Sequence, residues 1–313
     1  MHKKGFFYLI VTIVFFSTYE VVSKTVAEHV DPAQLNFIRF LGGGLILFPP
    51  AVMDLRQRGT RLNMKDYIYC LFLGLLLVGI SMILLQYGIN LTRANLAAVI
   101  FSANPLFVAL AAVFLLGEPL PRTKVLGLAL GFVGVGLTLS GDDGMHGTFF
   151  SGVLCLVLSA LIFGIYTVAG KKIALRIGSL TMNSLSFVLG SLTLVPFLLF
   201  RHIPLFNFDT TVWPQMVYLT VFVTGLAYYT YFLGLSMVDT SLGSMVFFIK
   251  PLLASLLAAV TLGEKVTLNL AVGTLLVLVS IYLVQCSVVR TNAGQSPIQD
   301  ALPEPSIPSS KPK

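Results

Sequence analysis

The feature that most constrains this chain is a sequence pattern that occurs twice, 146 residues apart, inside long apolar segments. The first copy has Asn104-Pro105 followed by Gly117-Glu118. The second copy has Lys250-Pro251 followed by Gly263-Glu264 at the matching positions. A repeat of this kind within apolar segments is typical of a membrane protein built from two copies of one unit.

The composition supports a membrane protein. Hydrophobic residues make up 56% of the 313 residues and charged residues only 11%, whereas roughly a quarter of an ordinary soluble domain is charged. The formal net charge is +7, but the basic residues lie in short separate loops and form no single patch. This distribution indicates membrane topology and argues against a nucleic-acid partner.

Ten segments are long and apolar enough to cross a bilayer, which takes about 20 residues each. The segments are 5–27, 33–53, 66–89, 95–116, 123–140, 148–170, 180–200, 213–235, 240–262 and 267–289. Their continuous apolar character predicts helices and not barrel strands. We therefore predict an all-α integral membrane fold of ten transmembrane helices, arranged as two repeats of five helices around a central cavity. The repeats are 1–141 and 147–290, and a Pro-rich segment, 291–313, is expected to be a disordered cytoplasmic tail.

The basic residues also predict the orientation. The loops on the N-terminal side carry 14 Lys and Arg residues and the opposite loops carry 3. Basic loops remain in the cytoplasm, so both termini are predicted to lie there, in a multi-pass protein of the cytoplasmic (plasma) membrane. Because each repeat has an odd number of spans, the second copy must be inverted relative to the first.

Four ionisable side chains fall inside predicted spans, where each costs at least a few kcal/mol. In one interpretation Glu20 pairs with Lys24 or Arg39, and Lys24 and Arg39 are structural charges that reach toward the interface. In the other, the Glu20 carboxylate is a proton or substrate site. Lys250 lies about ten residues into its span, near the middle of the bilayer. It either forms a structural ion pair with Glu20 or binds substrate.

The two prolines mark the same level in both repeats. Pro105 and Pro251 each remove a backbone hydrogen bond, so both are predicted as hinges. They place Asn104 and Lys250 at corresponding depths, and irregular backbone at membrane depth is tolerated where it lines a cavity. We therefore predict that Asn104 and Lys250 contact the substrate.

Aromatic side chains surround this level. An apolar and aromatic wall with a few polar groups is the usual form of a small-molecule site, although any one aromatic residue is more often packing. Three bases against one acid favour an anionic or zwitterionic substrate. The aromatic candidates are Tyr19, Tyr87, Tyr166, Tyr228 and Phe247.

No catalytic or cofactor motif appears in the chain. Gly170-Lys171 lacks the other glycine of a phosphate-binding loop, and the four histidines lie at span ends or in loops. The three cysteines show no metal-ligand spacing. The chain is thus expected to be no enzyme and to need no cofactor or metal.

The motifs together resemble the drug/metabolite transporter superfamily, in its ten-helix EamA branch. The resemblance covers residues 5–289 and rests on Phe16-Ser17-Thr18-Tyr19 leading to Lys24, on Arg39-Phe40, and on the repeated proline and Gly-Glu motifs. The second copy adds Phe163-Gly164-Ile165-Tyr166 with Lys171. The resemblance implies two inverted repeats and transport of small metabolites, often export, by alternating access. It also implies that Lys24 and Arg39 are scaffold features, whereas Glu20 and Lys250 depart from the family pattern.

The expected function is secondary active transport of a small polar metabolite, an amino acid or organic anion, and export is the expected direction. The expected partners are this substrate, the lipid bilayer and protons as coupling ion, in a monomer or weak homodimer. One alternative is a polyspecific exporter of drugs or lipophilic compounds whose charges are only structural. Another is a membrane-embedded enzyme or scaffold, for which the sequence shows no catalytic constellation.

Overall fold

The computed structural model describes the backbone of residues 2–140, 147–237 and 245–294, and the side chains of 4–140, 147–237 and 248–286. These residues form helices and contain no β-strand. The first repeat holds α1 (His2–Thr25), α2 (Pro32–Gln57), α3 (Met64–Gly74), η1 (Leu75–Ser81), α4 (Met82–Leu91), α5 (Ala94–Ser102), α6 (Asn104–Leu116) and α7 (Arg122–Leu139). The second holds α8 (Thr148–Ile177), α9 (Ser179–Phe200), η2 (Thr210–Val212), α10 (Trp213–Val217), η3 (Tyr218–Leu226), α11 (Ala227–Leu235), α13 (Met245–Leu262) and α14 (Leu268–Gly294).

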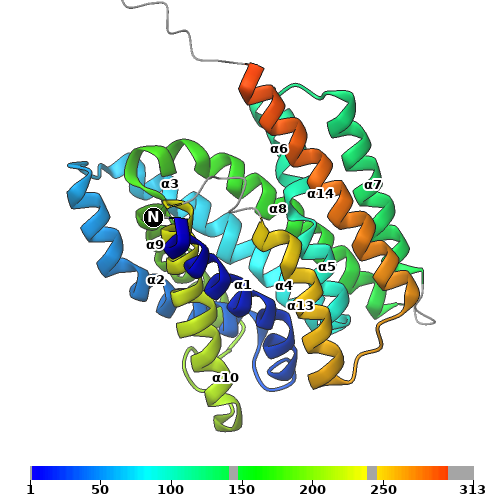
Figure 1. Ribbon diagram of the computed structural model, residues 1–313. Helices are drawn as coiled ribbons and strands as arrows, with labels where there is room; N and C mark the ends of the chain where they lie inside the picture. Colours follow the sequence, from blue (N-terminus) through cyan, green and yellow to red (C-terminus); the bar gives the residue numbers. More distant parts are fainter. Residues whose placement is uncertain (1, 141–146, 238–244, 295–313) are drawn as a thin grey trace, which may run out of the picture.

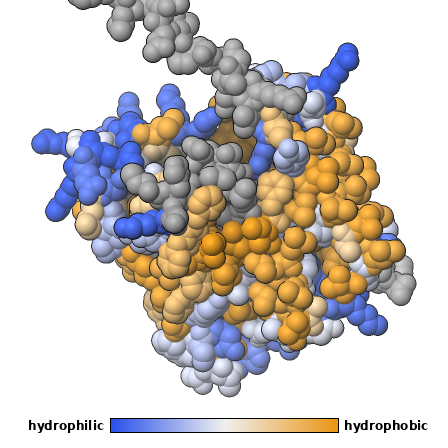
Figure 2. Space-filling model, in the orientation of Figure 1, coloured by the Kyte–Doolittle hydropathy of each residue, from blue (hydrophilic) through white to orange (hydrophobic). Residues whose placement is uncertain are grey.

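The helices have the length and composition of membrane spans. Within the described residues, nine continuous helical stretches are long and apolar enough to cross a bilayer, and the shorter apolar helix 248–262 accounts for the ninth predicted span. Figure 2 shows that apolar surface dominates the middle of the molecule and that polar residues gather toward its ends. These observations confirm the prediction of an all-α integral membrane protein.

The two repeats are inverted with respect to each other. The link 117–121 between α6 and α7 lies at one end of the molecule, together with the end of α14 (Figure 1). The matching link 263–267 between α13 and α14 lies at the opposite end (Figure 1). We call the first the termini end and the second the far end.

The repeated Gly-Glu motif has the same backbone role in both halves. Gly117 and Gly263 end their helices with a φ of +66°, a left-handed conformation that favours glycine. The N–H of Glu118 then donates to the Ala112 carbonyl, and the N–H of Glu264 to the Ala258 carbonyl. These bonds close the helix end around a left-handed glycine, so the motif is a helix stop that places a carboxylate just beyond each helix.

The two proline motifs differ in structure although they match in sequence. The fourth span is broken at Ala103, so α5 ends before Asn104 and α6 begins there. By contrast, α13 runs through Pro251 without interruption. A helix break at membrane depth thus exists only in the first repeat of the described chain.

Two further departures from the predicted spans concern helix type and length. The third and eighth spans each contain a π-helical segment, η1 and η3, at corresponding positions in the repeats. π-segments are rare and occur often at functional sites. In addition, α14 continues to Gly294, so residues 291–294 of the predicted disordered tail are helical, and 295–313 lie outside the described residues.

Candidate functional site

A cavity of about 670 Å³ lies between the two repeats. It reaches the termini end, where exposed Lys171 and partly exposed Glu118 line it. Both repeats contribute to its wall, which is mostly apolar and aromatic. The aromatic lining includes Phe16, Phe40, Phe101, Phe163, Tyr228 and Tyr231.

Arg39 places a buried cation in this wall. It lies on α2, is 3% exposed and lines the cavity. Its guanidinium carbon lies 4.4 Å from the ring centre of Tyr19 and 4.5 Å from that of Phe40. Its Nη2 donates to Asn36 Oδ1 at 3.1 Å, while its buried Nε has no hydrogen-bond partner. Among the described ion pairs Arg39 has no acidic partner.

Lys250 and Glu20 form a buried ion pair. Lys250 Nζ lies 2.6 Å from Glu20 Oε1, and the two side chains are 7% and 0% exposed. The ammonium also lies 5.1 Å from the ring centre of Phe101. Lys250 itself lines the cavity, and the Glu20 carboxylate compensates its charge. The other oxygen of Glu20 is buried without a hydrogen-bond partner.

Asn104 presents an unused amide. The residue is 1% exposed and lines the cavity, and neither its Nδ2 nor its Oδ1 has a hydrogen-bond partner. It occupies the first position of α6, directly after the break at Ala103. A buried amide without partners costs free energy, so this position is suited to a ligand that both donates and accepts a hydrogen bond.

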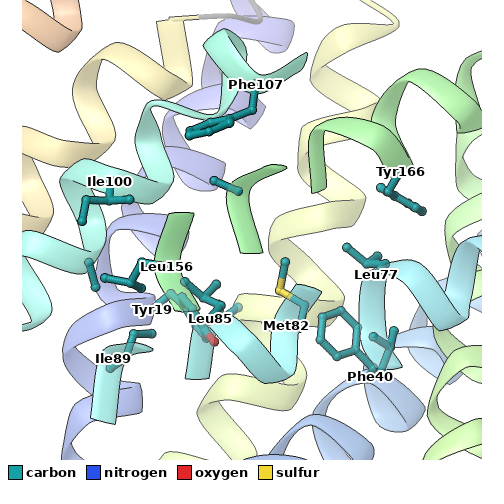
Figure 3. Packing of buried hydrophobic residues seen from close by; sticks show 14 of the residues in the cluster. Tyr19, Phe40, Leu77, Met82, Leu85, Ile89, Ile100, Phe107, Leu156 and Tyr166 are labelled. Carbon is teal, nitrogen blue, oxygen red and sulfur yellow. The ribbon is translucent and has the colours of Figure 1, made fainter. Parts of the chain in front are cut away.

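Three of the four predicted tyrosines, Tyr19, Tyr166 and Tyr228, line the cavity. Tyr19 Oη donates to Gln86 Oε1 at 3.2 Å and Tyr166 Oη to Asn183 Oδ1 at 2.8 Å. The Tyr228 ring packs edge-on against Phe187, which in turn packs edge-on against Phe40. Figure 3 shows Tyr19, Met82 and Phe40, which come from three different helices, in the same part of the buried cluster.

Two charged residues bind helix ends at the far end. Lys24 Nζ donates to the carbonyls of Ile89, Asn90 and Thr92 at 2.9, 2.9 and 2.6 Å, at the end of α4. Glu264 accepts from the backbone N–H groups that begin α5, those of Ala94 at 2.7 Å and Asn95 at 2.9 Å. Each charge thus compensates the partial charge of a helix end. We call these two residues the far-end lock.

The predicted pair between Glu20 and Lys24 is therefore absent. The three carbonyls at the end of α4 carry partial negative charge and lie within reach of Lys24, while Glu20 meets Lys250. Lys24 contacts backbone carbonyls in this structure, and its role as a structural charge stays a prediction.

The counterparts of the far-end lock lie at the termini end and are placed differently. Glu118 matches Glu264, and Lys171 matches Lys24 in the repeated motif that begins with Phe16 and Phe163. Both line the open part of the cavity. Glu118 Oε2 accepts from buried Lys124 Nζ at 3.2 Å.

One predicted site residue lies elsewhere, and the side chain of another lies outside the described residues. Tyr87 is 39% exposed and is not part of the cavity wall among the described residues. Its apolar exposed position fits a lipid-facing side chain. Phe247 lies in α13, but its side chain is outside the described residues.

Two polar residues near the site, Asn183 and Asn36, were not expected from the sequence. Asn183 accepts a hydrogen bond from Tyr166, and Asn36 accepts one from Arg39. Each is an amide within an apolar span, and such buried amides are a general signal for an internal polar network. No group of three or more His, Cys, Asp or Glu that could hold a metal occurs in the part of the chain that the structure describes.

Comparison with known proteins identifies the family. The model of the EamA-like transporter family matches residues 3–140 and 150–286, one copy in each half. An uncharacterized transporter of Clostridium kluyveri is 31% identical over 88% of this chain and 91% of its own. The uncharacterized transporter YvbV of Bacillus subtilis is 29% identical over 84% and 85%. A chloroplastic WAT1-related protein of Arabidopsis thaliana is 27% identical over 88% and 68%.

A solved crystal structure has the same fold. It is 21% identical in sequence, with a TM-score of 0.65 over 93% of this chain and 99% of its own. Both halves of the chain match the family model, and the described helices have the required lengths. The chain belongs to the EamA-like transporter family of the drug/metabolite transporter superfamily, and it is a multi-pass membrane transporter.

Proposed function

We propose that this transporter moves a small polar metabolite, anionic or zwitterionic, across the cytoplasmic membrane by alternating access, with export as its direction. One observation carries the proposal: the cavity between the repeats holds buried cations and an unpartnered amide, and it reaches one end of the molecule. A binding level between inverted repeats is the arrangement that lets a transporter expose one site to each side in turn.

The orientation and the direction of opening belong to the same proposal. With both termini in the cytoplasm, the cavity of this structure opens inward. An exporter takes up its substrate in this state. The far-end lock then keeps the other side closed until the repeats rock against each other.

The ion pair gives Glu20 a defined place in this cycle. In the empty cavity Glu20 compensates Lys250. A substrate carboxylate that approaches Lys250 would compete with Glu20, and protonation of Glu20 would release the ammonium. Proton coupling through Glu20 and a monomeric or weakly dimeric state are part of the proposal.

Counterflow in proteoliposomes tests the proposed function. Vesicles are preloaded with a pool of unlabelled amino acids and organic anions, and uptake of labelled members of the pool is measured. We expect saturable exchange of at least one carboxylate, and weaker exchange for Lys250→Ala. Empty vesicles and vesicles with heat-inactivated protein are the controls. Absence of exchange for every carboxylate would contradict the proposal.

The alternative of a polyspecific exporter is favoured by the mostly aromatic wall of the cavity. It predicts efflux of lipophilic cations or neutral drugs and little effect of Lys250→Ala or Arg39→Gln. The same vesicles, loaded with a fluorescent lipophilic cation, distinguish the two functions.

A further inference from the structure

Of the buried cations near the cavity, Arg39 and not Lys250 lacks a charged partner among the described residues. Lys250 is already paired with Glu20 at 2.6 Å, and Lys24 is bound by three carbonyls at the far end. At the mouth, Lys124 is paired with Glu118. Arg39 is buried in the cavity wall, with an amide oxygen and two aromatic faces around it. Among the buried cations of the cavity wall, it is the one whose charge the surrounding described side chains leave uncompensated.

The surroundings of Arg39 stabilise it only in part. A cation over an aromatic face gains about 0.5–2 kcal/mol, while burying a charge without a partner costs several kcal/mol. Arginine has five N–H donors, and its Nε is unused here. The planar fork of a guanidinium matches a carboxylate with two parallel hydrogen bonds. Arg39 can therefore bind an anion that enters the cavity.

The charge of the buried groups sets the charge of the ligand. Glu20 and Lys250 cancel each other, so Arg39 leaves this level of the cavity with one positive charge. A ligand with one net negative charge neutralises it. A zwitterion carries no net charge and brings an additional ammonium group toward two buried cations.

A second observation describes the rest of the ligand. Both atoms of the Asn104 amide are buried without partners in the same wall. They call for a ligand group that donates one hydrogen bond and accepts another, such as a hydroxyl next to a carboxylate. The aromatic side chains Phe16, Phe101 and Phe163 line the remaining space, which suits an apolar or aromatic body.

We propose that Arg39 is the substrate-binding cation of this transporter and that its preferred substrate is a monocarboxylate with net charge −1, a neutral hydrogen-bonding group and an apolar or aromatic body. This inference rests on the proposed transport function and narrows it. Zwitterionic amino acids become weaker substrates, and Lys250 becomes a charge that Glu20 holds in place.

A matched set of ligands tests the charge. 3-Phenyllactate and phenylalanine share one skeleton and differ in a hydroxyl against an ammonium group, and 3-phenylpropionate lacks both groups. Binding to purified protein is measured by ligand-induced thermal stabilisation, and transport by counterflow. We expect 3-phenyllactate to bind and exchange more strongly than phenylalanine, and 3-phenylpropionate to bind more weakly than 3-phenyllactate. Equal or stronger exchange of phenylalanine would overturn the inference.

Variants of Arg39 test the residue. Arg39→Gln should weaken binding of 3-phenyllactate by at least about 30-fold, as expected for truncating one partner of a buried charge pair. Arg39→Lys keeps the charge and loses the fork, so it should retain part of the affinity. Arg61→Gln removes a positive charge from an exposed loop position and is the matched control. Gel filtration in detergent establishes that each variant is folded.

The outcomes separate this inference from the proposed function. Wild-type exchange of carboxylates that Arg39→Gln leaves unchanged would overturn the role of Arg39 and keep the transporter. Loss of 3-phenyllactate binding in a folded Arg39→Gln variant, with Arg61→Gln unaffected, would support it. Absence of binding and exchange for every carboxylate in the wild type would overturn both proposals.

Discussion

At the residue scale, the buried pair of Glu20 and Lys250 links the two repeats. Glu20 comes from the first repeat and Lys250 from the second, and both side chains are almost completely buried. Such a pair is weak evidence for added stability, because desolvation offsets the attraction. Substitution of only one partner is nevertheless strongly destabilising, because it leaves the other charge buried without a partner.

We expect Lys250→Met or Glu20→Leu alone to lower the free energy of unfolding by about 3–5 kcal/mol. The double variant should recover most of this loss, because it removes both charges and keeps a similar volume. Thermal unfolding of the wild type and the three variants is measured in detergent with a dye that does not react with cysteine thiols. A double variant as unstable as the sum of the two single ones would contradict the pairing.

The proposed proton coupling depends on the carboxyl group of Glu20. Glutamine at this position cannot bind or release a proton, so for Glu20→Gln we expect substrate exchange to persist while transport no longer responds to a pH gradient. Counterflow and gradient-driven uptake in the same proteoliposomes separate the two activities. Unaltered gradient-driven uptake in Glu20→Gln would assign coupling to another group.

At the element scale, close approach of helices fixes the scaffold around the cavity. α3 and α9 cross at Gly74 and Gly190, where a Cβ built on Gly190 would lie 2.5 Å from the Gly74 carbonyl oxygen. This contact joins the third and seventh spans, one from each repeat. Because backbone atoms occupy the space, the helices must separate to admit any side chain.

Gly190→Ala should therefore destabilise the protein by about 1–3 kcal/mol. Gly136→Ala is the matched control, since apart from its chain neighbours and the nearby backbone of its own helix no atom lies within 4 Å of its Cβ position. This helical position should tolerate alanine or gain up to about 1 kcal/mol. Thermal unfolding of both variants in one detergent checks the prediction. Equal melting temperatures would mean that α3 and α9 do not pack this closely.

The far-end lock also acts on whole helices, because Lys24 binds the end of α4 and Glu264 binds the start of α5. Glu264→Gln loses the charge that stabilises the start of α5, so we expect the far end to open more often. A cysteine at Ala258, which is fully buried near this end, should react faster with an impermeant maleimide. The background lacks the three native cysteines, Cys70, Cys155 and Cys286.

The internal repeat supplies the control for this experiment. Glu118→Gln makes the same chemical change at the matching position of the other end, where Glu118 contacts Lys124. It should leave the reactivity at residue 258 unchanged. A similar rise in both variants would indicate general destabilisation and not release of the far end.

At the scale of the whole molecule, the loop charges predict an orientation in which the cavity opens to the cytoplasm. Fusion of green fluorescent protein after the C-terminus should give fluorescent bacterial cells, and fusion of alkaline phosphatase there should be inactive. Phosphatase fused after His202, in the link between α9 and η2, should be active. The reverse pattern would place the cavity mouth on the outside.

Much of the architecture follows from local properties of the chain. The described spans agree with the predicted ones to within a few residues at most ends, because hydropathy and helix-ending glycine motifs act over short distances. The sequence missed the π-segments η1 and η3 and the different behaviour of Pro105 and Pro251. Those features depend on how neighbouring helices accommodate freed backbone groups.

The sequence by itself determined the membrane class, the number of spans and the inverted repeat, since each follows from apolar length and from motif spacing. Only the tertiary structure decided that Glu20 meets Lys250, that Lys24 meets the end of α4, and that Arg39 faces the cavity with its charge uncompensated. Side-chain pairing is non-local: residues 230 positions apart become partners because two helices pack together, and spacing along the chain does not contain that contact.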